Sequence, residues 1–178
     1  MRLLSGIVIL MLSLTILGFR ASNKIAFKQN VSGYLKRSAD ANTIDMAKQE
    51  LKRVVDYLEA NNLTSGYTSI LWQTPDEDIS FWYQNLKATL NELENVKSDA
   101  TTLEKTNILM KLRETLMDAG GEGKEKVTVP DGMSVYPNNK LWAFLMAFAL
   151  TGLMVSVYLI VPKHAWEQPV KPAPTTSS

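Results

Sequence analysis

Two long uncharged stretches lie near the ends of the chain. Residues 3–19 contain seventeen residues without a charge, and residues 141–161 contain twenty-one. A bilayer core of about 30 Å is crossed by a helix of roughly 20 apolar residues, so the second stretch fits comfortably and the first only just. Trp142 and Tyr158 lie near the ends of the second stretch, where aromatic rings suit the headgroup region. The pattern predicts transmembrane helices over residues 1–19 and 141–161.

The first stretch also has the form of a secretory signal peptide, a basic start followed by an apolar run. Cleavage requires small residues at positions −3 and −1 of the cut site. A cut after Ala21 places Phe19 at −3, and no nearby position offers a clean pair. We therefore expect this segment to be retained as a membrane anchor.

Between the two stretches, apolar residues recur every three or four positions, as they do on one face of a helix. Residues 20–38 are predicted to continue the first membrane helix as a juxtamembrane helix. A helix over residues 43–61 follows, and Asn42 is placed to cap its start. Its apolar stripe has heptad-like spacing, as in a coiled coil, and consists of Ile44, Ala47, Leu51, Val54 and Leu58.

Two further helices are predicted from their capping boxes. The first begins at Thr74, with Pro75 at the first helical position and Glu77 at the third. Its buried face consists of Ile79, Trp82, Leu86, Leu90, Leu93 and Val96. The second begins near Thr101, with Glu104 as the reciprocal partner, and is expected to run to Ala119.

The rest of the chain is rich in residues that interrupt regular structure. Residues 120–140 contain the run Gly120–Gly123 and two prolines, which predicts an extended linker. Residues 127–129 have the composition of a short strand, but the pattern supplies no partner for it. The tail, residues 162–178, is rich in Pro, Ser and Thr and is expected to be disordered.

The predicted fold class is all-α, a membrane-anchored bundle of three to four antiparallel helices between two transmembrane helices. The bundle itself is assigned to residues 39–119. In layout alone, this order resembles the input half of bacterial chemoreceptor-type four-helix-bundle sensors. The resemblance implies a sensory module whose output comes from a separate protein, because only seventeen residues follow Val161.

The charges beside the two apolar stretches give opposing indications of topology. Basic residues are more numerous on the bundle side, which favours a cytosolic bundle, but this rule applies to loops shorter than about 60 residues. A basic start followed at once by an apolar run usually directs the next segment of the chain out of the cytoplasm. We therefore expect a two-pass protein with an extracytoplasmic bundle and both termini in the cytoplasm.

The composition excludes several classes of function. The chain has 19 basic and 18 acidic residues, one histidine and no cysteine. The net charge of +1 argues against nucleic-acid binding, and the absence of cysteine removes thiolate metal sites and cysteine catalysis. Neither apolar stretch contains Asp, Glu, Lys, Arg or His, which argues against a transporter or channel formed by this chain alone. With no catalytic set or phosphate-binding motif, and with the acids at 76–78 interpreted as helix-start residues, we predict no enzyme activity, cofactor or metal.

Two groups of residues are candidates for binding. Aromatic residues concentrate in and after the segment 62–74, where they could hold a small ligand or a protein partner, or simply fill the core. The candidates are Tyr67, Trp72, Trp82 and Tyr83. The second group has four-residue spacing on one helix face, as expected for contact with lipid headgroups or for an ordinary basic flank. It consists of Arg20, Lys24 and Lys28.

The pattern as a whole favours a non-catalytic membrane protein that presents its bundle for protein–protein interaction, as a scaffold or accessory subunit. Self-association through the bundle or the second membrane helix is a further expectation, because small residues recur there at four-residue spacing. They form two rows, Ala143–Ala147–Thr151 and Gly152–Ser156. The alternative is an extracytoplasmic sensory or small-ligand-binding module that lacks its own output domain.

Overall fold

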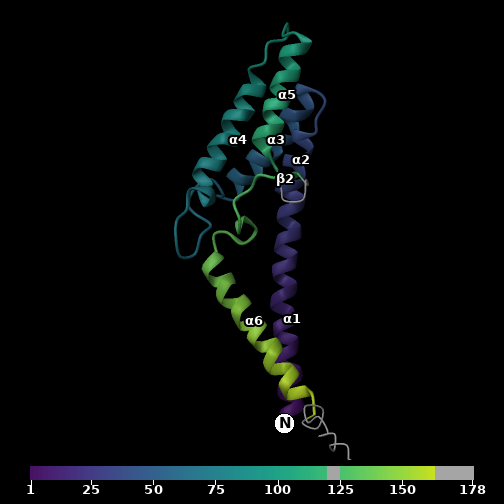
Figure 1. Cartoon of the computed structure of the whole chain (residues 1–178), viewed down its shortest axis with the longest axis vertical. Helices are drawn as coiled ribbons and strands as arrows, with labels where there is room; N and C mark the ends of the chain where they lie inside the picture. Colours follow the sequence, from purple (N-terminus) through teal and green to yellow (C-terminus); the bar gives the residue numbers. More distant parts are fainter. Residues whose placement is uncertain (120–124, 163–178) are drawn as a thin grey trace, which may run out of the picture. The chain divides into compact units, whose positions relative to one another are not determined.

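The structure is a computed structural model that describes residues 1–119 and 125–162. It is mostly helical, and it contains two helices long and apolar enough to span a membrane, as predicted. The chain divides into two compact units. The terminal unit comprises Met1–Phe19 and Ala143–Ser178, and the central unit comprises Arg20–Trp142. The elements of both are labelled in Figure 1.

The first helix is continuous from Arg2 to Ala39, over 38 residues. It consists of α1 (Arg2–Phe27), a π-helical turn (Lys28–Ser32) and α2 (Gly33–Ala39). The buried side chains in its second half lie four residues apart, at Phe27, Val31, Leu35 and Ala39. A π turn accommodates one extra residue per turn, so it keeps this spacing on the face that meets the core.

Helix α3 (Ile44–Ala60) begins one residue later than Asn42 would place it. The predicted cap at Asn42 is wrong, because Thr43 has the extended backbone of an N-cap and its hydroxyl oxygen accepts the Met46 N–H at 3.3 Å. The predicted apolar stripe is confirmed, since Ala47, Leu51, Val54 and Leu58 have no exposed surface.

Helix α4 (Ile79–Glu94) begins at a different cap from the predicted one. Pro75–Glu77 form a 3-10 turn, and the Asp78 carboxylate caps α4 by accepting the Ser80 N–H at 2.8 Å. Thr74 instead donates its hydroxyl to the Glu77 carboxylate at 2.6 Å. The helix cannot start earlier because the Glu77 carbonyl accepts the Thr68 N–H, which ties this turn to the preceding loop.

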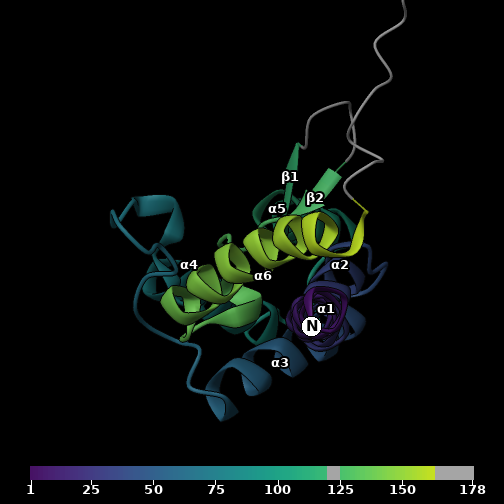
Figure 2. The same cartoon turned by 90° about the horizontal axis from the view of Figure 1, so that it is seen from below.

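Helix α5 (Thr102–Leu116) has the predicted capping box between Thr101 and Glu104. It ends at Leu116 rather than Ala119, because Met117–Ala119 form strand β1, which pairs antiparallel with β2 (Glu125–Val127). The expectation that a strand near residue 127 would lack a partner is therefore wrong. Figure 2 shows the two strands side by side near α5. The glycine run at 120–123 and the tail beyond Pro162 lie outside the described residues.

The core of the central unit forms around α3, which packs against α2, α4 and α5. Its fully buried side chains are mostly leucine, and come from every helix of the unit: Leu35, Leu51, Leu58, Ile79, Leu86, Leu93, Leu112 and Leu116. The segment after β2 also contributes, since its 3-10 turn (Met133–Val135) buries Met133 in the same cluster.

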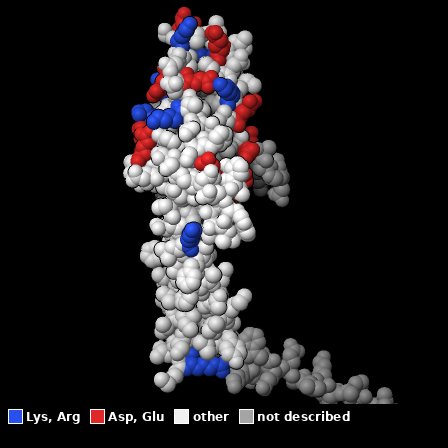
Figure 3. Space-filling view, turned by 90° about the vertical axis from the view of Figure 1, so that its left-hand side faces the viewer, with Lys and Arg blue, Asp and Glu red and all other residues white. Residues whose placement is uncertain are grey.

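Ion pairs join the helices of the central unit at its surface. The Arg113 guanidinium on α5 binds both Asp40, just after α2, and Glu125 on β2. Arg113 lowers the pKa of the Asp40 carboxyl through their hydrogen bond. On the face seen in Figure 3, charged side chains gather over the central unit, whereas the surface of the two apolar helices is almost uncharged.

Within the terminal unit, the start of α1 packs against the end of α6 (Asn139–Ile160) through small residues. A Cβ added at Gly6 would lie 3.0 Å from the Cβ of Leu159, and one at Gly152 would meet the Ser13 hydroxyl. Ala149 and Ser156 are also buried, whereas the other predicted row of small residues, 143–147–151, is exposed. The Gly152–Ser156 row is therefore used for packing within the chain.

Candidate functional site

The loop between α3 and α4 has a tightly held base. The Ile79 N–H donates to the Gly66 carbonyl at 2.9 Å, and Tyr67 and Asp78 form an isolated antiparallel bridge. Gly66 has φ +103°, a conformation that L side chains rarely adopt. The base of the loop is therefore fixed to the start of α4 by backbone hydrogen bonds.

The same base is attached to the segment that leads into α6. The Tyr136 hydroxyl donates to the Ser65 carbonyl at 2.7 Å. At Gly132 (φ +84°), a Cβ would lie 2.7 Å from the Asn139 side-chain nitrogen and 3.6 Å from the Cβ of Thr68. This close approach leaves room only for glycine at position 132.

The tip of this loop, residues Ile70, Leu71 and Trp72, is exposed to solvent. The three side chains are 43%, 77% and 75% exposed, respectively. The tip belongs to a run of sixteen residues without a charge, residues 60–75. Three consecutive exposed apolar residues on a loop are a feature of interaction sites rather than of ordinary surface.

The structure separates the four aromatic candidates. Trp82 is buried, and its indole N–H donates to the Thr128 carbonyl at 2.9 Å. Trp72 is exposed at the loop tip, and Tyr67 lies at the loop base. Tyr83 contacts α3 through its hydroxyl. Trp82 therefore contributes to the core, whereas Trp72 remains available to a partner.

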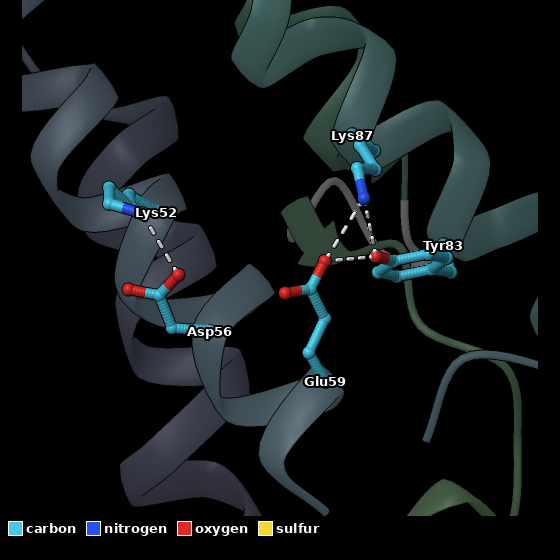
Figure 4. A network of polar contacts seen from close by, with 5 residues as sticks. All are labelled: Lys52, Asp56, Glu59, Tyr83 and Lys87. Carbon is cyan, nitrogen blue, oxygen red and sulfur yellow. Dashed lines mark hydrogen bonds and ion pairs between the residues drawn. The ribbon is translucent and has the colours of Figure 1, made fainter. Parts of the chain in front are cut away.

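Tyr83 takes part in a polar network between α3 and α4, drawn in Figure 4. Its hydroxyl donates to the Glu59 carboxylate, and the Lys87 ammonium donates to the same carboxylate at 3.1 Å. Both bonds lower the pKa of Glu59, and the bond from Tyr83 has the larger effect. Burial, and then the bond to Glu59, raise the pKa of Tyr83. Beside this network, Lys52 donates to Asp56 at 3.0 Å. The network braces the two helices with paired charges.

The pKa shifts in the described part of the chain all move away from neutrality. General acid–base catalysis uses groups whose pKa is shifted toward the working pH. Here the shifted carboxyls have lowered pKa values, and the shifted hydroxyl and cationic groups have raised ones. The carboxyls are those of Asp40, Glu59 and Glu104, and the others are Lys52, Tyr83, Lys87 and Arg113. These groups are suited to ion pairing rather than to proton transfer.

An open groove of about 610 Å³ lies between the start of α4 and the segment after β2. Phe81 lines it and is 63% exposed, while Trp82 forms part of its wall. The lining also carries five acidic residues and one basic residue, a net charge of −4: Asp76, Glu77, Asp78, Asp118, Asp131 and Lys126. Sequence reasoning missed this groove, because residues 118 and 126–131 reach α4 only through the pairing of β1 with β2.

The three basic candidates do not have the same surroundings. Arg20 is half-buried, and its guanidinium donates to the Ser134 hydroxyl at 3.3 Å. Lys24 and Lys28 are exposed, and Lys28 begins the π turn. Arg20 therefore has a role within the central unit, whereas the two lysines are exposed to solvent.

The chain matches no known family model, and comparisons with the curated proteins and with the solved structures found no similar protein. Within residues 1–119 and 125–162, no three His, Cys, Asp or Glu side chains are grouped as a metal site would require. Function is therefore argued from the surfaces themselves.

Proposed function

We propose that the chain is a non-catalytic two-pass membrane protein, anchored by α1 and α6, whose central unit acts as a helical bundle that binds another protein. The observation that carries this proposal is the acidic groove beside the exposed ring of Phe81. An exposed aromatic ring next to a groove is the kind of anchor on which protein interfaces depend. Two helices of membrane length support the anchoring.

The lining of the groove indicates the chemistry of the partner. Its net charge of −4 favours a segment with basic residues, since complementary charge speeds association and excludes acidic partners. Phe81 offers an apolar contact at the same place, so the matching segment carries an apolar side chain beside its basic ones. Asp131, with a side chain 90% exposed, is open to such a partner.

Site-directed photo-crosslinking in cells that naturally express the chain tests this proposal. We expect Phe81→p-benzoylphenylalanine to give one discrete protein adduct, and the same replacement at Leu103, which is 70% exposed on α5, to give none. Asp131→Asn should weaken the adduct, whereas Asp45→Asn should not.

Asp45 is a matched control for Asp131. Its side chain is 93% exposed and pairs with Lys48 at 3.4 Å, much as Asp131 pairs with Lys126 at 3.7 Å. It lies in the first turn of α3, at the opposite end of that helix from the loop before α4. Equal adducts from positions 81 and 103, or equal effects of the two Asn variants, would contradict the assignment of the groove.

A second candidate function, sensing of a small ligand, is favoured by the volume of the groove. Ligand sites usually measure about 300–1,000 Å³, and this groove measures about 610 Å³. The acidic lining would select a cationic ligand with an apolar part. Native mass spectrometry of the full chain extracted from its own membranes separates the two functions. A stoichiometric small-molecule adduct that Asp131→Asn removes would favour sensing.

We place the bundle on the extracytoplasmic side, with both termini in the cytoplasm. The chain contains no cysteine, so single cysteines can report its topology. Ser98→Cys should react with a membrane-impermeant maleimide on intact cells, and Ser177→Cys should react only after lysis. The reverse pattern would place the bundle in the cytosol and end the sensory alternative.

A further inference from the structure

We propose that the loop tip, residues Ile70, Leu71 and Trp72, inserts into the headgroup region of the membrane that α1 and α6 cross. This inference rests on the proposed membrane crossing and adds a third contact with the lipid. The partner is a bilayer surface, and the contact is made by side chains that are 43%, 77% and 75% exposed. Leu71 and Trp72 are the most exposed of them.

The position of the loop base within the central unit follows from hydrogen bonds made by residues 132–139. Tyr136 binds Ser65 at the base of the loop, and Tyr136 lies three residues before the start of α6 at Asn139. Asn139 itself binds the Gly132 carbonyl at 3.0 Å. The loop base therefore lies where the chain leaves the central unit for its second apolar helix.

The first apolar helix leaves the central unit at the same place. Arg20, the first residue of the central unit, donates to the Ser134 hydroxyl, and Ser134 belongs to the turn just before Tyr136. Both exits to the apolar helices and the loop base are thus joined through residues 132–139. The loop base therefore lies on the side of the central unit from which both apolar helices leave.

The chemistry of the loop fits a lipid interface. Trp is enriched at membrane interfaces, where its apolar ring and its polar N–H are both accommodated. The tip is flanked by the uncharged polar residues Ser69 and Gln73. Residues 63–75 contain no charged side chain, so insertion of the tip would carry no charge toward the hydrocarbon core, where a charge is costly.

The acids that follow the tip decide which headgroup fits. Glu77 accepts a hydrogen bond from Thr74, and Asp78 caps α4, so both carboxylates already have partners. Asp76 is exposed. Their negative charge would be repelled by an anionic surface, so the structure favours a zwitterionic one such as phosphatidylcholine.

Depth-dependent quenching on the full chain tests the inference. Single-cysteine variants labelled with an environment-sensitive nitrobenzoxadiazole dye are reconstituted in phosphatidylcholine vesicles, with and without doxyl-labelled phosphatidylcholine. Leu71→Cys is the test, and Leu103→Cys is its matched control, with exposed fractions of 77% and 70%. Leu103 is separated from the loop by the 16 residues of α4, about 24 Å of helix.

A third variant tests the membrane crossing separately from the insertion of the loop tip. Leu150→Cys lies at the middle of α6, 53% exposed, and its dye must be quenched if α6 spans the bilayer. We expect quenching at positions 150 and 71, with the emission at 71 reduced about twofold relative to that at 103.

The possible outcomes separate clearly. Quenching at 150 together with equal emission at 71 and 103 would overturn the insertion of the tip and leave the membrane crossing intact. No quenching at 150 would overturn the crossing, and the inference with it. Because Leu71 is exposed, its replacement should not disturb the core. Matching circular dichroism spectra of the three variants would check this.

Discussion

Replacement of Gly66 by alanine should loosen the base of the loop by a calculable amount. At φ +103°, an L residue is strained, and its Cβ would also meet the Tyr136 hydroxyl. The strain costs about 2 kcal/mol. Moving Tyr136 aside breaks its bond to the Ser65 carbonyl, which contributes about 1 kcal/mol. We therefore expect Gly66→Ala to cost about 3 kcal/mol, if both effects are complete.

A double variant, Gly66→Ala with Tyr136→Phe, distinguishes displacement of the Tyr136 hydroxyl from general destabilisation. Tyr136→Phe alone should cost about 1 kcal/mol, since it only removes the hydrogen bond. In Gly66→Ala that bond is already broken, so adding Tyr136→Phe should cost nothing further. The two substitutions are thus expected to be coupled by about 1 kcal/mol, as contacting residues usually are.

Hydrogen–deuterium exchange of the full chain measures these energies locally. The Thr68 and Ile79 N–H groups donate across the loop base, at 3.1 Å to Glu77 and 2.9 Å to Gly66. Their exchange should be roughly a hundredfold faster in Gly66→Ala and about fivefold faster in Tyr136→Phe, because each 1.4 kcal/mol is a factor of ten. Ser65→Ala, which retains the carbonyl acceptor, should exchange like the natural chain.

Two results would refute this reasoning. If the double variant exchanged faster than Gly66→Ala by the further factor of about five, the two effects would be independent and the steric account wrong. If Gly66→Ala exchanged like the natural chain, neither the strain nor the close approach of Tyr136 would exist.

Three further predictions concern other parts of the molecule. Thr101→Ala removes the capping box and should cost about 1 kcal/mol, so amides in the first turn of α5 should exchange about fivefold faster. Arg113→Met should lower the urea midpoint at pH 7 only slightly, because the pair is exposed and screened by solvent. The pKa of Asp40 is lowered in the folded state, so this contribution is present above its ordinary pKa of 3.8 and disappears as the pH falls through the lowered value. Gly152→Leu should separate the apolar helices at Ser13 and reduce disulfide formation between cysteines placed at Gly6 and Leu159.

Each of these predictions has a control of the same chemical type. Thr106→Ala removes a hydroxyl that bonds within α5 and caps nothing, so an equal effect would count against the cap. Lys111→Met is the control for Arg113→Met, because it breaks a pair with Glu92 instead of Asp40. If the urea midpoints of these two variants still differed at pH 2, Asp40 would not explain the difference. Ala147→Leu adds volume on the exposed face of α6, and an equal loss of disulfide there would refute the packing at Gly152.

Short-range patterns in the sequence predicted the helices well. The capping box at Thr101 was predicted correctly, because both partners lie within three residues and nothing else competes for them. The stripe of α4 placed Trp82 among Ile79 and Leu86, and all three are buried. The aromatic concentration, by contrast, could not separate buried Trp82 from exposed Trp72, because only the helical spacing distinguishes them.

The errors occurred where distant segments meet. The sequence has the pattern of a capping box at Thr74, but pairing of Glu77 with the loop at Thr68 moves the helix start to Ile79. The strand at Met117–Ala119 is only three residues long, too short for its pattern to predict it, and it forms because Glu125–Val127 return beside it. The groove beside Phe81 depends on the same pairing, so no local pattern could have indicated it.

The continuous first helix has a consequence for how the chain tolerates change in length. Its 38 residues extend about 57 Å, roughly twice a bilayer core, with no break before α2 enters the core of the central unit. Each residue turns a helix by about 100°, so one residue inserted between Val31 and Leu35 would turn Phe27 and Val31 away from the core that Leu35 and Ala39 meet. The π turn holds one residue more than an α-helical turn, so this stretch already contains one such offset. Within the central unit, the stretch from Phe27 to Ala39 should therefore accept substitution on its exposed face more readily than a change in length, because the phase of its buried face is what the core requires.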